Sequence, residues 1–249
     1  ITNHRRRALL GILPEGQQAR LRSSGGPGAA AWLNPPTKAA HRLNDDVCKL
    51  SLRNRLLLDI SPDGATCTHQ SSTGQRCGKA LDGSGRHALS CGMEGDWVAR
   101  HNMIRDALAH IIEELTGARP AKEVLAPQWQ VRGKDALLDL RLIHDDLWVD
   151  VTVAYPYCAA AASRDGAAAL LAEAEKRRKY PGASLIPCAM EAQGRFGETC
   201  LAFLRRLVRQ LEPAERNEKL RDAYQSLSAA LQRGNAVILA SAARRWAPT

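Results

Sequence analysis

Two aspartates, Asp139 and Asp150, have the residue type and spacing needed for metal-dependent hydrolysis. Each interrupts an alternating apolar pattern, the first over residues 136–143 and the second over residues 147–153. The patterns predict two strands joined as a hairpin. Because two adjacent carboxylates repel each other unless a cation binds between them, the pair predicts a Mg²⁺ or Mn²⁺ site. Such a site can generate hydroxide for phosphodiester hydrolysis.

The relative position of the two carboxylates depends on how the strands pair. If His144 pairs with Leu147 across a two-residue turn, Asp139 and Asp150 are diagonal neighbours on one sheet face. A shift of one residue would place them on opposite faces. The alternative interpretation is a pair of solvent-facing aspartates on a half-exposed sheet.

A lysine beside such a site would orient the attacking water and stabilise charge on the phosphorane. In the compact arrangement it follows the second carboxylate by two residues, where this sequence has Thr152. The charged run at 175–180 offers Lys176, on the same helix face as Tyr180, and its neighbour Lys179, which could also bind phosphate. The alternative is an ordinary solvated helix end.

A second group of chemically active residues lies in the Gly- and Ser-rich segment 61–95, which has few apolar residues to form a core. Three cysteines and a histidine in it make up a common tetrahedral zinc set, with His69 as a possible substitute ligand: Cys67, Cys77, His87 and Cys91. Zn²⁺ would supply the order that the segment lacks. The alternative is a chance scatter of thiols.

Further polar residues lie between the cysteines and the aspartates. Arg100, His101 and Asn102 open a predicted helix, where they could bind DNA phosphate or support the active site, or form an ordinary helix surface. Glu123 is a candidate third catalytic carboxylate near the metal, and it could equally be a surface residue.

The elements that must position these residues follow from hydrophobic periodicity. We expect strands at 136–143, 147–153 and 184–190. Helices are predicted at 5–22, 38–58, 97–117, 167–180, 198–211 and 214–233. The domain organisation predicted is a helical linker over 1–60, a zinc knuckle over 61–95, a core over 96–211 and a helical extension over 212–249.

Charge is unevenly distributed along the 249 residues, whose formal net charge is +9. Residues 61–163 hold 10 Lys and Arg against 13 Asp and Glu, whereas residues 164–249 hold 15 against 9. An acidic centre between basic flanks suits a protein that binds cations and nucleic acid. The seven cysteines without a signal segment or a long apolar run favour an intracellular, non-membrane setting.

Taken in order, these motifs resemble the C-terminal region of site-specific non-long-terminal-repeat retrotransposon proteins, in which a zinc knuckle precedes a restriction-like endonuclease. The resemblance covers about residues 60–211. Its most specific parts are the Asp-Val-Thr-Val strand at 150–153 and the Glu-Lys-Arg-Arg-Lys-Tyr segment at 175–180. Residues 1–58 look like the linker that follows the reverse transcriptase in such proteins.

The resemblance implies an α/β (α+β) fold of the PD-(D/E)XK type, a mixed sheet flanked by helices. Asp139 matches the first aspartate, Asp150 the second, Lys176 a lysine displaced onto a helix and Glu123 an upstream glutamate. The sequence departs from the family in having Leu138 where a proline is usual. The interval from Asp150 to Lys176 is also longer, which keeps Lys179 as an alternative.

The function expected from the resemblance is a DNA endonuclease that nicks target DNA, so that the exposed 3′ hydroxyl primes reverse transcription. Its expected partners are DNA, element RNA and an attached reverse transcriptase, in a nuclear or other intracellular setting. Two alternatives stay open. The first is a catalytically inactive nucleic-acid-binding module from a degenerate or domesticated element, and the second is a structural domain that stabilises the polymerase.

Overall fold

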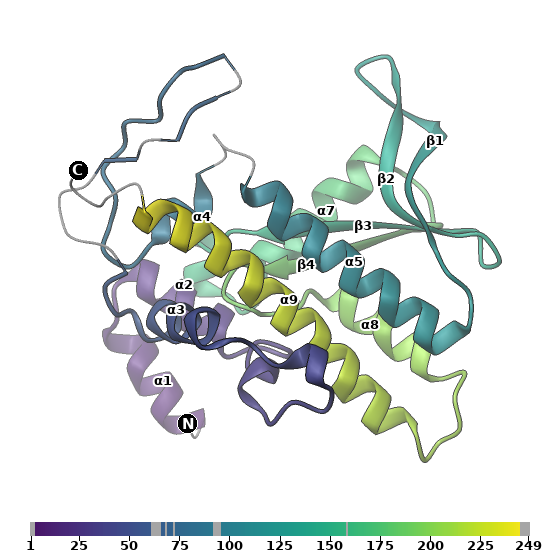
Figure 1. The fold of residues 1–249 in the computed structure, drawn as a ribbon, viewed down its shortest axis with the longest axis horizontal. Coiled ribbons are helices and arrows are strands. Elements are labelled where there is room, and N and C mark those ends of the chain that lie inside the picture. Colours follow the sequence, from purple (N-terminus) through teal and green to yellow (C-terminus); the bar gives the residue numbers. More distant parts are fainter. Residues whose placement is uncertain are drawn as a thin grey trace.

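The protein has a mixed α+β fold around one four-stranded sheet in the order β1-β2-β3-β4 (Figure 1). The computed structural model describes residues 3–60, 66–67, 69–71, 73–91, 96–157 and 159–244. The strands are β1 (Ala121–Val131), β2 (Lys134–Leu142), β3 (Leu147–Ala154) and β4 (Leu185–Glu191). β1, β2 and β3 are antiparallel neighbours, and β4 runs parallel to β3. The three strands predicted from the sequence are confirmed.

The sequence analysis missed strand β1. Its apolar residues do not alternate, and Pro127 stands in the middle of the segment. The structure accommodates this proline by a register irregularity between Ala126 and Gln130 at the edge of the sheet. Proline is tolerated at edge strands and bulges because no ladder hydrogen bond is lost there.

Helices cover both faces of the sheet and extend beyond it. Within the described residues they are α1 (Asn3–Ile12), α2 (Glu15–Ser24), α3 (Asp45–Leu56), α4 (Arg86–Ser90), α5 (Asp96–Thr116), α6 (Ala159–Ser163), α7 (Ala167–Lys179), α8 (Glu198–Val208) and α9 (Arg216–Arg244), with short 3-10 turns at Ala31–Leu33 and Ala39–His41. In the part of the chain that the structure describes, no helix has an apolar stretch long enough to cross a lipid bilayer.

Three helix predictions were wrong in their limits. The helix expected at 5–22 is two helices, because Pro14 lies between α1 and α2. The one expected at 38–58 begins only at Asp45, where the Asn44 side chain accepts a hydrogen bond from the Val47 amide and caps the helix. The last helix, α9, continues well past residue 233 to Arg244.

The main core lies between one face of the sheet and the helices α5, α8 and α9. Alternate residues of β3, including Val149 and Val151, pack there against Ile104, Leu108 and Leu204. The residues between them in the strand point to the opposite face, which α7 covers behind the sheet in Figure 1. Helix α7 is also the crossover that joins the parallel strands β3 and β4.

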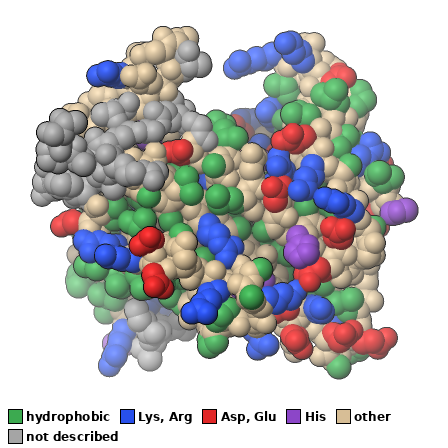
Figure 2. Space-filling view, in the orientation of Figure 1, with side chains coloured by type: hydrophobic (Ala, Val, Ile, Leu, Met, Phe, Trp, Pro, Cys, Tyr) green, Lys and Arg blue, Asp and Glu red, His purple; other side chains and the backbone are tan. Residues whose placement is uncertain are grey.

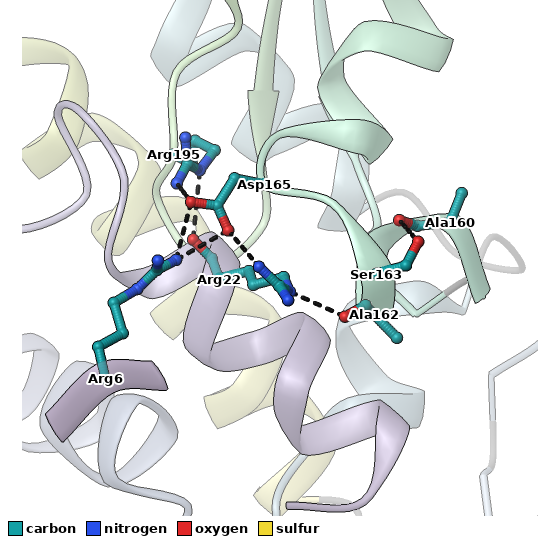
Figure 3. A network of polar contacts seen from close by, with 7 residues as sticks. All are labelled: Arg6, Arg22, Ala160, Ala162, Ser163, Asp165 and Arg195. Atoms are coloured by element: carbon teal, nitrogen blue, oxygen red, sulfur yellow. Dashed lines mark hydrogen bonds and ion pairs between the residues drawn. The ribbon is translucent and has the colours of Figure 1, made fainter. Parts of the chain in front are cut away.

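One carboxylate links α1 and α2 to the rest of the fold, in addition to the packing of α2 against α6. Asp165, just before α7, accepts hydrogen bonds from Arg6 on α1, Arg22 on α2 and Arg195 in the loop after β4 (Figure 3). Although burial opposes it, pairing with Arg6 and Arg22 lowers the pKa of Asp165. Four segments far apart in the sequence thus meet at a single acidic residue.

Helices α5 and α9 pack unusually closely near Gly234. A Cβ placed at Gly234 would lie 2.5 Å from Cγ and 2.7 Å from Cα of Arg100 on α5. Glycine is therefore required at this helix position by the neighbouring helix rather than by its own backbone conformation.

We predict that Gly234→Ala lowers the free energy of unfolding by about 1–3 kcal/mol, because the added methyl group would overpack the α5–α9 contact. Alanine ordinarily stabilises a helix by about 1 kcal/mol relative to glycine. Gly11→Ala on α1 is a matched control, because its Cβ would meet nothing within 4 Å. Denaturant unfolding of both variants tests this, and a Gly234→Ala protein as stable as the unmodified chain would contradict it.

Candidate active site and metal centre

The hairpin register brings the two aspartates to the point where β2 and β3 stop pairing. Leu142 pairs with Leu147 and Leu140 with Val149, around a turn over residues 143–146. The expected pairing of His144 with Leu147 was wrong, because the turn has four residues, with Asp146 at a φ of 48°. The observed register differs from the expected one by two residues, and it ends next to Asp139 and Asp150. The two carboxyls are close together, since Asp139 contributes to the raised pKa of Asp150.

Asp139 lies where the pairing of β2 and β3 ends. Leu140 and Val149 are the last pair of this ladder, and beyond this point β2 turns away with β1 to form the projecting hairpin in Figure 1. The backbone N–H of Val151 donates to Asp139 Oδ2 at 2.6 Å. The carboxylate thus satisfies a strand amide that would otherwise bond to a β2 carbonyl.

His101 holds the other oxygen of Asp139. On α5, its Nε2 lies 2.8 Å from Asp139 Oδ1. Burial opposes ionisation of Asp139, but His101 and the Val151 amide lower the pKa of this carboxyl. Asp139 is therefore held as a carboxylate with a fixed orientation.

Asp150 is contacted by Lys176, as the sequence analysis expected from the helix segment. Lys176 Nζ on α7 lies 2.7 Å from Asp150 Oδ2. Asp150 is only 5% exposed, and burial raises its pKa to about 6, with Asp139 adding to this effect and Lys176 opposing it. Burial also disfavours the lysine cation, yet the charge of Asp150 raises the pKa of Lys176. The lysine is thus an ammonium donor at neutral pH.

Glu123 lies on β1, beside the strand that carries Asp139. Lys122 pairs with Leu140 and Val124 with Leu138, so Glu123 is next to Asp139 across the β1–β2 pair. Its carboxylate instead forms an ion pair with Arg105 on α5, one helical turn after His101.

The residues predicted to bind nucleic acid lie in different environments. Arg100, a candidate contact for DNA phosphate in the sequence analysis, is only 6% exposed, and its guanidinium donates to Asn235 on α9. Asn102 is half-buried on α5. Lys179 lies with its Nζ 4.8 Å from the centre of the Tyr180 ring, while Lys176 is the lysine on Asp150.

Sequence reasoning did not assign two features of this site. The contact of His101 with Asp139 joins residues 38 positions apart, and the Val151 amide is a backbone group that no motif marks. Arg105 could have been found from the sequence, since it follows His101 by four residues and so shares its helix face.

The four predicted zinc ligands form one compact group. Their ligand atoms all lie within 4.8 Å of one another: Cys67, Cys77, His87 and Cys91. The group does not include His69, the substitute considered from the sequence. These three cysteines and one histidine could together hold a metal ion such as zinc.

Two short pieces of structure bring the four ligands together. The Cys67 amide donates to the Lys79 carbonyl and the Gly78 amide to the Cys67 carbonyl, which places Cys67 beside Cys77. His87 and Cys91 come from the one-turn helix α4 and its C-terminal end. Asp82 fixes the start of α4 by accepting from the amides of Arg86 and His87.

Two of the distances within the group match those expected around a tetrahedral zinc ion. Cys67 Sγ lies 3.8 Å from Cys91 Sγ, and Cys77 Sγ lies 3.4 Å from His87 Nε2. Zinc bonds of about 2.3 Å to sulfur and about 2.0 Å to nitrogen imply separations of about 3.8 Å and about 3.5 Å. Burial raises the pKa of the Cys67 thiol to about 12. A cation would favour the thiolate.

A scan against models of known protein families found no match to this chain, and a comparison with curated proteins found none either. The geometry of the carboxylate pair and of the Cys/His group is therefore the basis for assigning their chemistry.

We predict that the purified protein binds about one equivalent of zinc, and that Cys77→Ser and His87→Ala each abolish this binding because they remove one of four ligands. Metal content measured by atomic absorption after dialysis tests this. Cys48→Ser is the control, because this free cysteine lies on α3, outside the ligand group. A folded protein free of metal, or Cys77→Ser with unchanged zinc content, would contradict the prediction.

Proposed function

We propose that this chain is a DNA endonuclease domain of the PD-(D/E)XK type, dependent on Mg²⁺ or Mn²⁺, that nicks target DNA as part of a retrotransposon-type protein. The observation that carries the proposal is the contact between Lys176 and Asp150 beside Asp139. A sheet with antiparallel and parallel pairs, covered by helices on both faces, agrees with this fold type.

The two carboxylates fit the oxygen-ligand chemistry of magnesium. Asp139 and Asp150 would hold the ion, since carboxylate oxygens have lone pairs left after one hydrogen bond each. When bound, the cation supplies positive charge to the phosphate and lowers the pKa of a water molecule. The raised pKa of Asp150, which follows from burial first and from Asp139 in addition, also indicates a place where added positive charge is stabilising.

Lys176 and His101 would hold other groups of the site in position and would not themselves transfer protons. Lys176, held as a cation by Asp150, would donate hydrogen bonds to the attacking water and stabilise the charge that develops on the phosphate. His101 fixes the orientation of Asp139 from the opposite helix. The side chains of the candidate site thus come from four elements: Asp139 from β2, Asp150 from β3, Lys176 from α7 and His101 from α5.

The charge of the whole chain also supports a nucleic-acid substrate. The formal net charge of +9 favours a polyanionic partner. We propose DNA as the substrate, with element RNA and an attached reverse transcriptase as further partners in a nuclear or other intracellular setting. Zn²⁺ at the four-ligand centre would keep the segment around Cys67 and Cys77 in place.

We predict that the protein nicks supercoiled plasmid in the presence of Mg²⁺ or Mn²⁺, and that Asp150→Asn and Lys176→Met each reduce the rate by at least about 100-fold. Lys179→Met is the matched control: this lysine lies on the same helix turn but on the Tyr180 ring, and its loss should leave the rate nearly unchanged.

The assay separates the proposal from its main alternative. Equal nicking rates for the unmodified protein, Asp150→Asn and Lys176→Met would exclude the site assignment. DNA binding by a folded protein that does not nick with either metal would instead identify an inactive nucleic-acid-binding module.

A further inference from the structure

The β1–β2 hairpin has one buried and one exposed face. Val124, Ala126, Ala136 and Leu138 belong to a cluster that also contains Trp148. On the other face Leu125 and Leu137 are 59% and 58% exposed, and they are direct cross-strand partners. Two leucines side by side on a projecting arm form a patch rather than an isolated exposed side chain.

This leucine pair shares one face of β2 with Asp139, the face opposite Leu138 and Ala136. Leu137 precedes Asp139 by two residues on β2, so both side chains leave the strand on the same face, about 7 Å apart along it. A ligand with a phosphate group at Asp139 therefore extends directly onto the leucine pair. A polypeptide covering the two leucines would also obstruct access to Asp139, which favours the substrate itself as the partner.

The end of the hairpin is basic. Val131 pairs with Lys134 across a two-residue turn in which Arg132 and Gly133 both have positive φ, at 52° and 74°. Arg132 and Lys134 are exposed. Figure 2 shows Lys and Arg side chains at the end of this arm, reaching over a hollow beside it. A two-stranded ribbon of this kind fits a groove of duplex DNA.

We propose that Leu125 and Leu137 form an apolar wedge that enters the DNA beside the scissile phosphate and unstacks a base step, while Arg132 and Lys134 bind the backbone. Apolar side chains inserted between base pairs act in this way in other DNA-binding proteins. The inference rests on the proposed nuclease function, and it adds that the enzyme distorts its substrate at the cleavage point.

The test compares two DNA probes. Binding is measured by fluorescence anisotropy, in the Asp150→Asn background to prevent cleavage, with a short duplex and with the same duplex containing a central mismatched step. The Asp150→Asn protein should bind the mismatched duplex at least about tenfold more tightly than the paired one, because the wedge does not have to unstack that step, which costs a few kcal/mol. Leu125→Ser together with Leu137→Ser should weaken binding to the mismatched duplex more than to the paired duplex, so that most of this preference is lost.

The controls exclude a general effect on the protein. Ile143→Ser is matched, because Ile143 is 66% exposed but lies in the turn after β2, at the opposite end of that strand from the arm. It should leave both affinities unchanged. Leu137→Ser alone should give the same pattern in smaller measure, and thermal unfolding confirms that each variant is folded.

Each outcome bears on a different claim. Equal weakening on both probes, or no weakening on either, would overturn the wedge while leaving the nuclease proposal intact. Absence of binding to either probe by the Asp150→Asn protein itself would contradict the DNA-binding role on which both proposals depend.

Discussion

The candidate active site depends on the point where β2 and β3 stop pairing. Up to Leu140 and Val149 the two strands form a ladder, and beyond it the Val151 amide bonds to the carboxylate of Asp139. A buried amide left without an acceptor would cost about 1–3 kcal/mol, so the side chain stabilises the divergence of the strands. The same divergence frees Asp139 to face Asp150 and releases the hairpin that projects above them. The carboxylate pair and the exposed arm thus have one structural origin.

The environment of the two carboxylates differs although they are neighbours. Asp139 receives two donors, and these lower the pKa of its carboxyl despite burial. Asp150 is more deeply buried, and its pKa rises to about 6 even with Lys176 beside it. Adjacent buried carboxylates are unfavourable without a compensating cation. Lys176 supplies one positive charge, with its Nζ 2.7 Å from Asp150 Oδ2. Under the proposed function, a metal ion would supply the remainder.

The sequence predicted the residues of both sites better than the elements around them. Strand alternation marked Asp139 and Asp150 as residues that break the apolar pattern, and the structure brings the two carboxyls close enough for Asp139 to raise the pKa of Asp150. The zinc set followed from residue type alone. Strand β1 was missed because Pro127 and an irregular register conceal its periodicity. The burial of Arg100 could not be foreseen, since it depends on Gly234, which is 134 positions away in the sequence and contacts it only after folding.

The position of Lys176 shows why the lysine of the candidate site is harder to predict from the sequence than the two aspartates. A lysine two residues after Asp150 would leave β3 on the same face as the carboxylate, where Thr152 now stands. Helix α7 crosses that face on its way from β3 to β4, so a side chain from its last turn reaches the same space from above. Because the side chain of lysine is long and flexible, its ammonium group can reach this space either from β3 or from α7. The proposed hydrolysis requires an amine near Asp150 Oδ2, but this amine can come from any element that reaches that point. The carboxylates are therefore tied to the strand period, whereas the lysine can occupy any position that the crossover helix brings within reach.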